Sequence, residues 1–575
     1  MDNQLPKSFM ILLAVLQGIA LTLLYRSLEG ATWPASDPIW FTSLATFVIS
    51  FPLLTLLVVE QGKIKKLLIY LLPFCLLLSL LGAYIGSEHY PLALINNDWL
   101  TATFVMTSLV ASFKALMYIQ QFIDKEAIHY AQLFKLSWRN FLLFIECWLF
   151  VLIFWGILNL GAALFDALDI EFFTALLRKE WFWIPTITLA FAFASIVFRG
   201  LLNVEQSIAT LLQVLIKFLL PVLTIVSLGF LATLPFAGFE KLWQTGSGTS
   251  LVLWLQLLTL FFINTVYQQA SLQRPYNVVL HRLIIIGVGL LPIYSLIAAY
   301  GLWLRVDQYG LSVARCWAIL ICFLLACFSF GYLVGIIKKR DAWLEVQNKV
   351  NIGMGLIVLV SMLLVNSPLL NFQRIASDSQ IARLNDGKVT LEEFDYNYFA
   401  SNLGRQGYLA MQDLKAQIKN SHPEQVAIIE RMYVNPDFET VKELETLSEF
   451  IEHSVFWPQQ EAFPDELIKA TFDTLHFSNW APLNSHSFYF IAIDLNNDNL
   501  PEYVFIDETN HFTEAKLWFE NDGEWQQKYM NTDNPAQIKL LKTLLEAGKV
   551  EVEKPRYNHL KVGDVVFKVA NDVPN

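Results

Sequence analysis

Residues 67–85 read LLIYLLPFCLLLSLLGAYI, a run that contains no charged side chain. Lys65 and Lys66 precede this run, and Glu88 follows it. A helix of about 20 apolar residues crosses the hydrocarbon layer of a bilayer, which is roughly 30 Å thick. The stretch therefore predicts a transmembrane helix.

Ten similar runs occur between Ser8 and Leu370. The eleven expected spans lie at roughly 8–25, 39–59, 67–85, 99–119, 141–165, 181–198, 212–236, 250–267, 283–303, 313–337 and 350–370. The whole chain is 55% hydrophobic and its mean hydropathy is +0.45, more than a soluble chain of this length normally carries. The sequence predicts a polytopic α-helical membrane bundle over residues 1–371, with a soluble tail behind it.

The loops on the two sides of the bundle differ in their basic residues. One set of alternate loops contains 14, namely Lys7, Lys63, Lys65, Lys66, Lys125, Lys135, Arg139, Arg199, Arg274, Arg282, Lys338, Lys339, Arg340 and Lys349. The opposite set contains Arg26, Arg178, Lys179, Lys241 and Arg305. Because cytoplasmic loops carry the excess of Lys and Arg, we expect the N-terminus inside the cell. An odd number of spans then places the tail outside the cytoplasm.

The soluble tail is acidic. From Phe372 to Asn575 there are 18 Lys and Arg against 33 Asp and Glu, which leaves 22 against 18 in the preceding part. A nucleic-acid-binding protein needs a basic surface, so this balance argues against such a partner. All five cysteines lie in the apolar runs, and the tail has none with which to form a disulfide.

The tail changes its periodicity along its length. Residues 372–480 follow a helical pattern, with a helix start expected at Thr390–Glu393 and an amphipathic helix at 438–451 after Asn435-Pro436-Asp437. Residues 481–575 predict a small α+β domain. Its expected strands lie at 488–493, 503–506, 516–519, 549–552 and 565–569, with a hairpin turn at 521–523 and a helix at 535–547.

Between the first two of these strands lies the segment Asp494–Glu502, which we call the candidate calcium loop. Its candidate oxygen ligands are the side chains of Asp494, Asn496, Asp498 and Glu502 and the carbonyl of Leu500. Oxygens at alternate positions of a tight loop suit Ca²⁺, which takes six to eight of them. An EF-hand is excluded because Phe505 stands where its bidentate glutamate belongs. The spacing resembles the calcium loops of FG-GAP-like repeats, with Asn499 in place of the usual glycine; the alternative is a hairpin stabilised by its own Asn and Asp side chains.

Several polar residues lie within the predicted spans. Lys114 in span four and Glu146 in span five have similar expected depths, so they are a candidate ion pair in a wet pathway; alternatively, each reaches the nearest interface. Gln256, Asn264 and Gln268 lie near one face of span eight. They are candidates for coordinating a polar solute, although such amides more often join neighbouring helices.

Three segments carry a family resemblance: Gln308–Arg315, Ser379–Val389 and Phe394–Gly407. In these the chain resembles a bacterial membrane-protein family catalogued as domain of unknown function 4153. The resemblance implies a polytopic protein of the bacterial inner membrane with an extracytoplasmic tail. It implies no catalytic residues.

Three functions are open at this point. The leading hypothesis is a non-enzymatic envelope protein whose exported, calcium-stabilised domain senses or binds an extracytoplasmic ligand or protein partner. The alternative is a secondary transporter that uses the polar residues of the bundle, although the sequence shows no inverted repeat. The third is a membrane transferase that acts on lipid-linked substrates through Glu88, His89 and Asp98. The lipid bilayer is the one partner common to all three.

Overall fold

The computed structural model describes residues 5–92, 94–95, 97–124, 128–168, 170–200, 202–238, 242, 247–267, 275–433, 447–458, 463–478, 486–495, 500–508, 513–521, 524–530, 544–545, 548, 550, 560–562 and 565–567. The chain divides into two compact units, Met1–Val434 and Asn435–Asn575. The boundary between the units falls inside the segment 372–480, which the sequence predicts to be helical.

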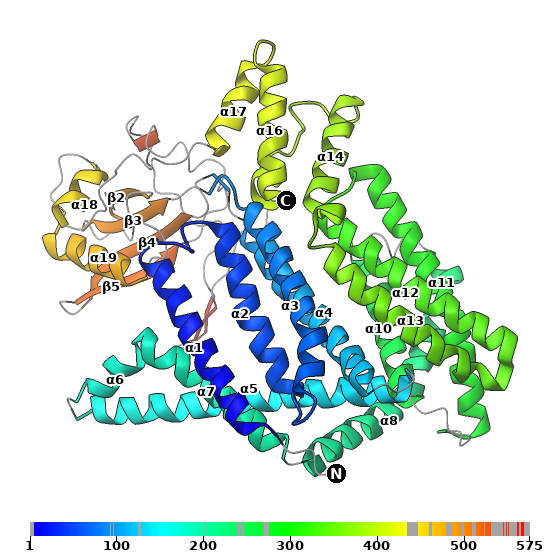
Figure 1. Ribbon diagram of the computed structural model, residues 1–575. Helices are drawn as coiled ribbons and strands as arrows, with labels where there is room; N and C mark the ends of the chain where they lie inside the picture. Colours follow the sequence, from blue (N-terminus) through cyan, green and yellow to red (C-terminus); the bar gives the residue numbers. More distant parts are fainter. Residues whose placement is uncertain are drawn as a thin grey trace. The chain divides into compact units, whose positions relative to one another are not determined.

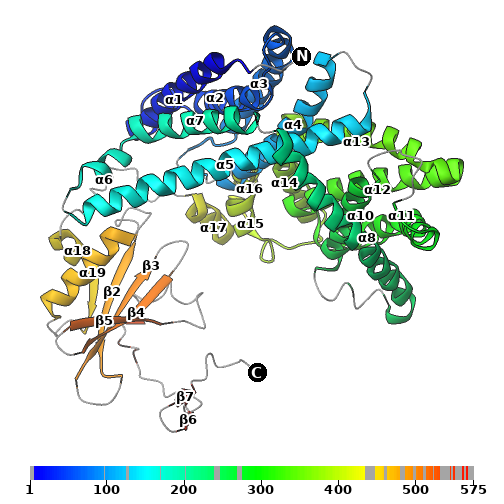
Figure 2. The same ribbon diagram turned by 90° about the horizontal axis from the view of Figure 1, so that it is seen from below.

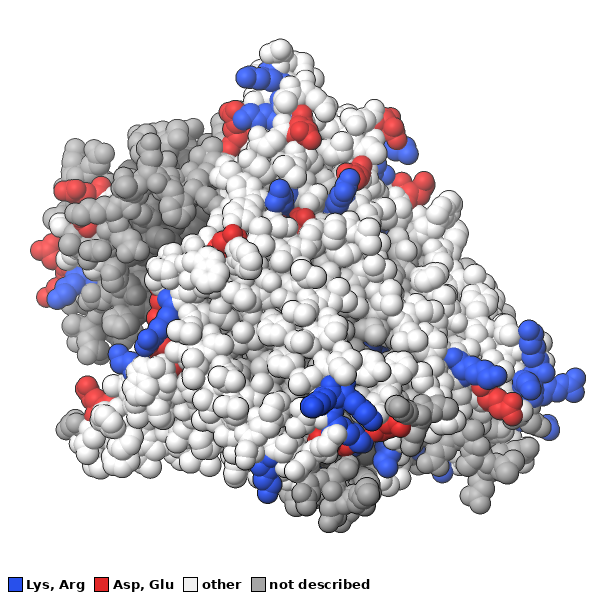
Figure 3. Space-filling view, in the orientation of Figure 1, with Lys and Arg blue, Asp and Glu red and all other residues white. Residues whose placement is uncertain are grey.

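Eleven helices in the described part of unit 1 are long and apolar enough to cross a membrane, as predicted. They are α1 (Lys7–Glu29), α2 (Pro38–Val58), α3 (Ile64–Ser87), α4 (Asp98–Asp124), α5 (Tyr130–Asp166), α7 (Glu180–Phe198), α8 (Leu202–Ala237), α10 (Gly248–Val266), α11 (Val278–Tyr309), α12 (Val313–Lys339) and α13 (Trp343–Leu364). On the face shown in Figure 3 a broad band of this unit bears almost no charged residue, and the charges gather toward its ends. This distribution is what a bilayer requires, since a charge in the hydrocarbon layer is costly.

The bundle has two helical halves, each with its own apolar core. One core joins α1–α5 and α7 around buried residues such as Leu71 and Cys147. The other joins α8 and α10–α13 around Leu291 and Tyr294. The long helix α5 packs against helices of both halves, and Figure 2 shows it extending across them. Helix α4 of the first half packs along α13 of the second, so these two helices form the main contact between the halves.

Small residues allow α2 and α3 to pack very closely. A Cβ added at Gly86 would lie 2.3 Å from the carbonyl oxygen of Pro38, and one at Gly82 would lie 2.7 Å from Oγ1 of Thr46. Glycines four residues apart lie on one face of a helix, which is the common arrangement for close contact between membrane helices. Any larger residue at Gly86 would separate the two backbones.

Four shorter helices follow the bundle within unit 1: α14 (Phe372–Asn385), α15 (Tyr396–Asn402), α16 (Gly404–Ile418) and α17 (Pro423–Tyr433). They pack around Phe399, Met411 and Ile429 and project from one end of the bundle, which we call the α14 end (Figure 1). The prediction that a helix starts at Thr390 is wrong. Thr390 and Glu393 form the reciprocal hydrogen bonds of a capping box, but only a turn follows, and α15 starts after Asp395, whose side chain caps it.

Unit 2 contains a five-stranded mixed sheet. Its strands, in spatial order, are β1 (Ser454–Trp457), β2 (Ser487–Ile493), β3 (Glu502–Glu508), β4 (Thr513–Asn521) and β5 (Glu524–Met530). Strand β1 is parallel to β2, and the other pairs are antiparallel. Helices α18 (Leu447–His453) and α19 (Asp465–Ser478) contribute Phe450 and Leu467 to the core beneath the sheet.

The sequence predicts β2, β3 and β4 correctly but misses β1, which lies in a segment expected to be helical. Residues 521 and 524 pair across the expected hairpin turn between β4 and β5. A separate ladder joins β6 (Leu560–Val562) and β7 (Val565–Phe567), the latter within an expected strand. Most of the helix expected at 535–547, the strand at 549–552 and the first part of the run 438–451 lie outside the described residues. The molecule is nevertheless a helical membrane bundle followed by a small mixed α+β region, as predicted.

Candidate functional site

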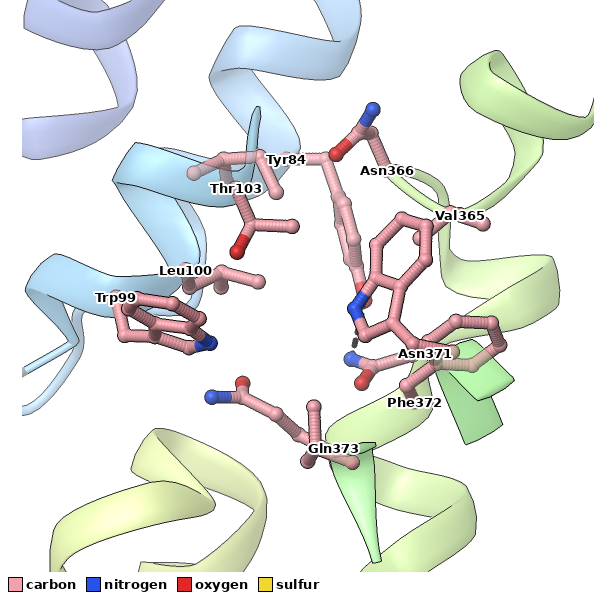
Figure 4. Close-up of a pocket in the computed structure, with 12 residues that line it drawn as sticks. Tyr84, Trp99, Leu100, Thr103, Val365, Asn366, Asn371, Phe372 and Gln373 are labelled. Atoms are coloured by element: carbon pink, nitrogen blue, oxygen red, sulfur yellow. Dashed lines mark hydrogen bonds between the residues drawn. The ribbon is translucent and has the colours of Figure 1, made fainter. Parts of the chain in front are cut away.

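A small cavity lies at the α14 end, where the two halves of the bundle meet α14. Tyr84 of α3 and Trp99 of α4 line it from the first half, Trp317 of α12 lines it from the second, and Asn371 and Gln373 close it (Figure 4). Its volume is about 30 Å³, which is room for one or two water molecules. Its walls combine aromatic rings, aliphatic side chains and uncharged polar groups.

Hydrogen bonds across this cavity connect α14 to the first half of the bundle. Asn371 donates to the hydroxyl of Tyr84 at 2.7 Å, and the Gln373 amide donates to Oδ1 of Asn97 at 2.9 Å. Gln373 is 4% exposed, and its Oε1 has no hydrogen-bond partner among the described residues. A buried carbonyl oxygen without a donor is unfavourable, so a water molecule or the hydroxyl of a ligand would stabilise it.

Helix α14 also binds the connection between α11 and α12 in the second half. Gln380 donates to the carbonyl oxygens of Tyr309 and Leu311, and Arg383 donates to those of Asp307 and Gln308, at 2.7 to 3.2 Å. The chain can turn here because Gly310 has a φ of +70°. Three of the four partner carbonyls lie in the segment Gln308–Arg315, and both donors lie in Ser379–Val389. Two of the segments that carry the family resemblance therefore form one contact.

The third such segment contacts both halves. The amide N–H of Val313 donates to the Tyr398 hydroxyl at 2.9 Å, and burial raises the pKa of this phenol. Arg405 donates to the carbonyl oxygen of Ser87 at 2.7 Å, and Gln406 donates to the carboxylate of Glu88 at 2.8 and 3.1 Å. Helices α14–α16 are thus joined by side-chain hydrogen bonds to the first and the second half of the bundle. We call this set of contacts the junction at the α14 end.

Of the residues considered for a transferase, Glu88 contacts α16 and His89 contacts groups of the first half. Glu88 is 4% exposed and accepts the two bonds from Gln406. His89 contacts the carbonyl oxygen of Ile85 at 2.9 Å and the Thr101 hydroxyl at 3.1 Å. Asp98 starts α4. Their observed contacts are those of groups that stabilise the loop and its neighbours.

Lys114 and Glu146 are both half-buried, in α4 and α5 respectively. No ion pair joins them among the described residues, and Oε1 of Glu146 is buried without a hydrogen-bond partner there. The structure therefore does not bring the two charges together as the ion-pair hypothesis requires. Each remains a polar group within a candidate span.

Gln256 is fully buried in the second half of the bundle. Its amide nitrogen lies 2.6 Å from the Ser295 hydroxyl of α11 and 2.7 Å from the Ser329 hydroxyl of α12. The amide nitrogen thus joins three helices, whereas Oε1 of Gln256 has no hydrogen-bond partner among the described residues. The observed contacts match the alternative in which the amide holds neighbouring helices together.

Asn264 has a different environment. Four donors converge on its Oδ1, namely the hydroxyls of Tyr130 and Tyr332 and the side-chain amides of Gln347 and Asn351, at 2.6 to 3.2 Å. The Tyr332 hydroxyl also reaches Oδ1 of Asn351, so it can donate its one hydrogen to either of two carbonyl oxygens in this cluster. The cluster joins α5, α10, α12 and α13. Gln268, the third amide of the predicted face, lies outside the described residues.

The candidate calcium loop joins two antiparallel strands, β2 and β3. Ile493 pairs with Glu502 at the ends of the strands, and the amide N–H of Leu495 donates to Oε2 of Glu502 at 2.7 Å. The carboxylate of Glu502 therefore reaches back over the start of the loop. Asn496 and Asp498 lie outside the described residues, so the ligand set as a whole remains a prediction.

Sequence reasoning missed the hydrogen-bonded junction at the α14 end. Gln373, Asn97, Asn371 and Tyr84 are single uncharged polar residues in apolar or loop sequence, a pattern that rarely indicates a site. A signal was present in the three segments of the family resemblance, because all three lie at this junction. The sequence alone does not show that they are neighbours.

The comparisons with known proteins agree with this arrangement. No curated protein and no solved structure matches the chain. The model of the family described as "Domain of unknown function (DUF4153)" matches residues 30–414, about two thirds of the chain. The matched region begins just after α1 and ends within α16, so it contains ten of the candidate spans together with the junction. The chain belongs to this family of membrane proteins.

Proposed function

We propose that this protein is a non-enzymatic protein of the bacterial inner membrane, whose bundle is the support for an extracytoplasmic part that binds a ligand or a protein partner. In this proposal the exported part comprises α14–α17 and unit 2, and Ca²⁺ stabilises unit 2 through the candidate calcium loop. The excess of basic residues in one set of loops supports this orientation.

The observation that carries the proposal is the junction at the α14 end. Side-chain hydrogen bonds from α14 and α16 reach both halves of the bundle, so these helices are held by the whole membrane part. By contrast, the amide nitrogen of Gln256, on the predicted solute face, is engaged by bonds between helices, while its Oε1 has no partner among the described residues. This use of polar groups favours a receptor or support over a pathway for a solute.

The proposed export of unit 2 fits the proposed role of calcium. Extracellular calcium modules bind at about 10⁻⁴ to 10⁻³ M, an affinity that is useful only outside the cytoplasm. With Ca²⁺ at five times Kd, binding stabilises the folded form by about 1 kcal/mol. That energy corresponds to a roughly sixfold lower population of locally opened molecules.

Hydrogen exchange of the full-length protein in detergent tests this proposal. Calcium at several millimolar should slow amide exchange in β2 and β3 several-fold relative to a chelator, and Asp494→Ala should remove the effect. Asp465→Ala is a matched control, because Asp465 lies in the first turn of α19 and outside the loop. Equal exchange with and without calcium would remove the metal from the proposal.

A transporter is the second candidate, because Oε1 of Glu146 is buried without a partner among the described residues. If Glu146 takes part in transport, Glu146→Gln in proteoliposomes should abolish uptake of a solute that the wild type carries. Glu171→Gln, a change at an exposed position, should not affect it. Unchanged flux in Glu146→Gln would exclude this role of the residue.

A further inference from the structure

A second cavity lies at the other end of the bundle, among the ends of α2, α3, α4 and α5. Its volume is about 220 Å³, several times the share of one water molecule in the liquid, about 30 Å³. Its lining is mainly polar and includes Glu60, Lys63, Asp124, Gln132 and Arg139. We call it the α2–α5 cavity.

One part of its wall is a group of three charges. The ammonium of Lys63 lies 2.6 Å from Oδ1 of Asp124 and 2.9 Å from Oε2 of Glu60. The Lys63 ammonium donates to the carboxylates of Asp124 and Glu60, and these bonds, the one to Asp124 first, raise the pKa of Lys63. Two carboxylates against one ammonium leave this group with a net charge of −1.

Arg139 supplies the opposite charge in the same cavity. It is half-buried in α5, and neither a hydrogen bond nor an ion pair engages its guanidinium within the described part of the chain. The Gln132 side chain, one to two helical turns earlier on α5, likewise has no partner there and offers an amide donor. A guanidinium presents five N–H donors in a planar fork that matches carboxylate and phosphate groups.

Among the described residues that line it, the cavity therefore has a group of net charge −1 and one unpaired cation, and their charges sum to zero. A simple anion would meet the carboxylates, and a simple cation would meet Arg139. A molecule with both charges satisfies both walls, with its ammonium toward Glu60 and Asp124 and its anionic group toward Arg139. A primary ammonium suits the carboxylates better than a quaternary one, because only the former donates hydrogen bonds.

From this complementarity we infer that the α2–α5 cavity binds a compact zwitterion with a primary ammonium and a phosphate-type anion, such as phosphoethanolamine. The same group occurs free in solution and as the headgroup of phosphatidylethanolamine. Both sources present a primary ammonium and a phosphate to the cavity, although the free monoester carries up to one more negative charge than the phosphodiester of the lipid. This site is separate from the junction at the α14 end and does not depend on the proposed function.

Thermal unfolding of the full-length protein in detergent tests the binding of free phosphoethanolamine. The melting temperature of the wild type should rise with phosphoethanolamine and rise less with ethanolamine or inorganic phosphate alone. Arg139→Gln should weaken the apparent affinity at least tenfold, since it removes a bidentate charge-assisted contact. Lys135→Gln is the matched control: it removes one positive charge one turn away on α5, at an exposed position that does not line the cavity. It should bind like the wild type.

Nanodiscs separate the two sources. If the cavity takes lipid headgroups, discs that contain phosphatidylethanolamine should stabilise the wild type over discs of phosphatidylcholine alone, and Arg139→Gln should lose this difference. If only the free compound stabilises the wild type, the ligand is a soluble zwitterion. Arg139→Lys keeps the charge and should bind with intermediate affinity, and it replaces Arg139→Gln if that variant does not fold. Equal responses of the wild type and the Arg139 variants in both assays would overturn the inference.

Discussion

Gly404 provides the most direct test of the junction at the α14 end. Its φ is +48°, and an added Cβ would lie 2.6 Å from Nδ2 of Asn97 and 2.7 Å from its Oδ1. Asn97 accepts the bond from Gln373 and donates to the carbonyl oxygen of Glu88 at 3.1 Å. Gly404→Ala therefore strains the backbone and displaces the amide on which these two bonds depend.

The magnitude follows from these contacts. The left-handed backbone conformation costs an alanine about 1 to 2 kcal/mol. Each hydrogen bond lost at Asn97 adds about 1 kcal/mol, so we expect Gly404→Ala to destabilise the junction by about 3 to 4 kcal/mol. Gly387→Ala is the control: its φ is +69°, but nothing lies within 4 Å of its added Cβ, so it should cost only the backbone term.

Amide exchange of α14 and α16 in the full-length protein measures this difference. Exchange in these helices should become far faster in Gly404→Ala than in Gly387→Ala. With Asn97→Ala in the background, the extra effect of Gly404→Ala should shrink to that of the control, because the displaced amide is absent. If the two glycine variants behave alike in the wild-type background, the proposed close contact with Asn97 is wrong.

Three further predictions concern packing, titration and orientation. Gly86→Ala should destabilise the bundle by about 1 to 3 kcal/mol, because the added methyl group meets Pro38. Gly156→Ala is the control, since its Cβ has open space around it. Equal midpoints of thermal unfolding in the two variants would contradict the close packing of α2 and α3. Burial and the nearby Glu508 raise the pKa of Tyr489 to about 12, so the free energy of unfolding of unit 2 should fall as the pH rises from 10 to 12. Tyr489→Phe should make this free energy less dependent on pH over the same range. If the dependence on pH is the same in the variant as in the wild type, this account is wrong. A phosphatase fused after Asn575 should be active outside the cytoplasm, and activity of a cytoplasmic reporter instead would reverse the proposed orientation.

The apolar spans and the central strands were predictable because their signals are local. An uncharged run such as 67–85 can be satisfied only by a helix in a bilayer, whatever its neighbours are. The short continuous apolar run 488–493 similarly marks a buried strand. Strand β1 was not predictable, because Ser454–Trp457 is short and becomes a strand only by pairing with β2, which is far along the chain.

The candidate sites divide in the same way. The candidate calcium loop is visible in the sequence because its possible ligands lie within nine residues of one another. The junction at the α14 end combines residues from 84 to 406, and the α2–α5 cavity combines residues from 58 to 139. No local pattern marks Gln373 or Arg139 as special.

The amino-acid sequence by itself determined that this chain is a membrane protein with eleven candidate spans, because apolar length and the absence of charge act residue by residue. Only the tertiary structure decided which polar groups meet. Lys114 and Glu146 have similar predicted depths but form no ion pair among the described residues, while Gln373 and Asn97 do meet. Depth depends on position along one helix, whereas contact depends on how helices rotate and pack against one another, and that is set by the whole fold.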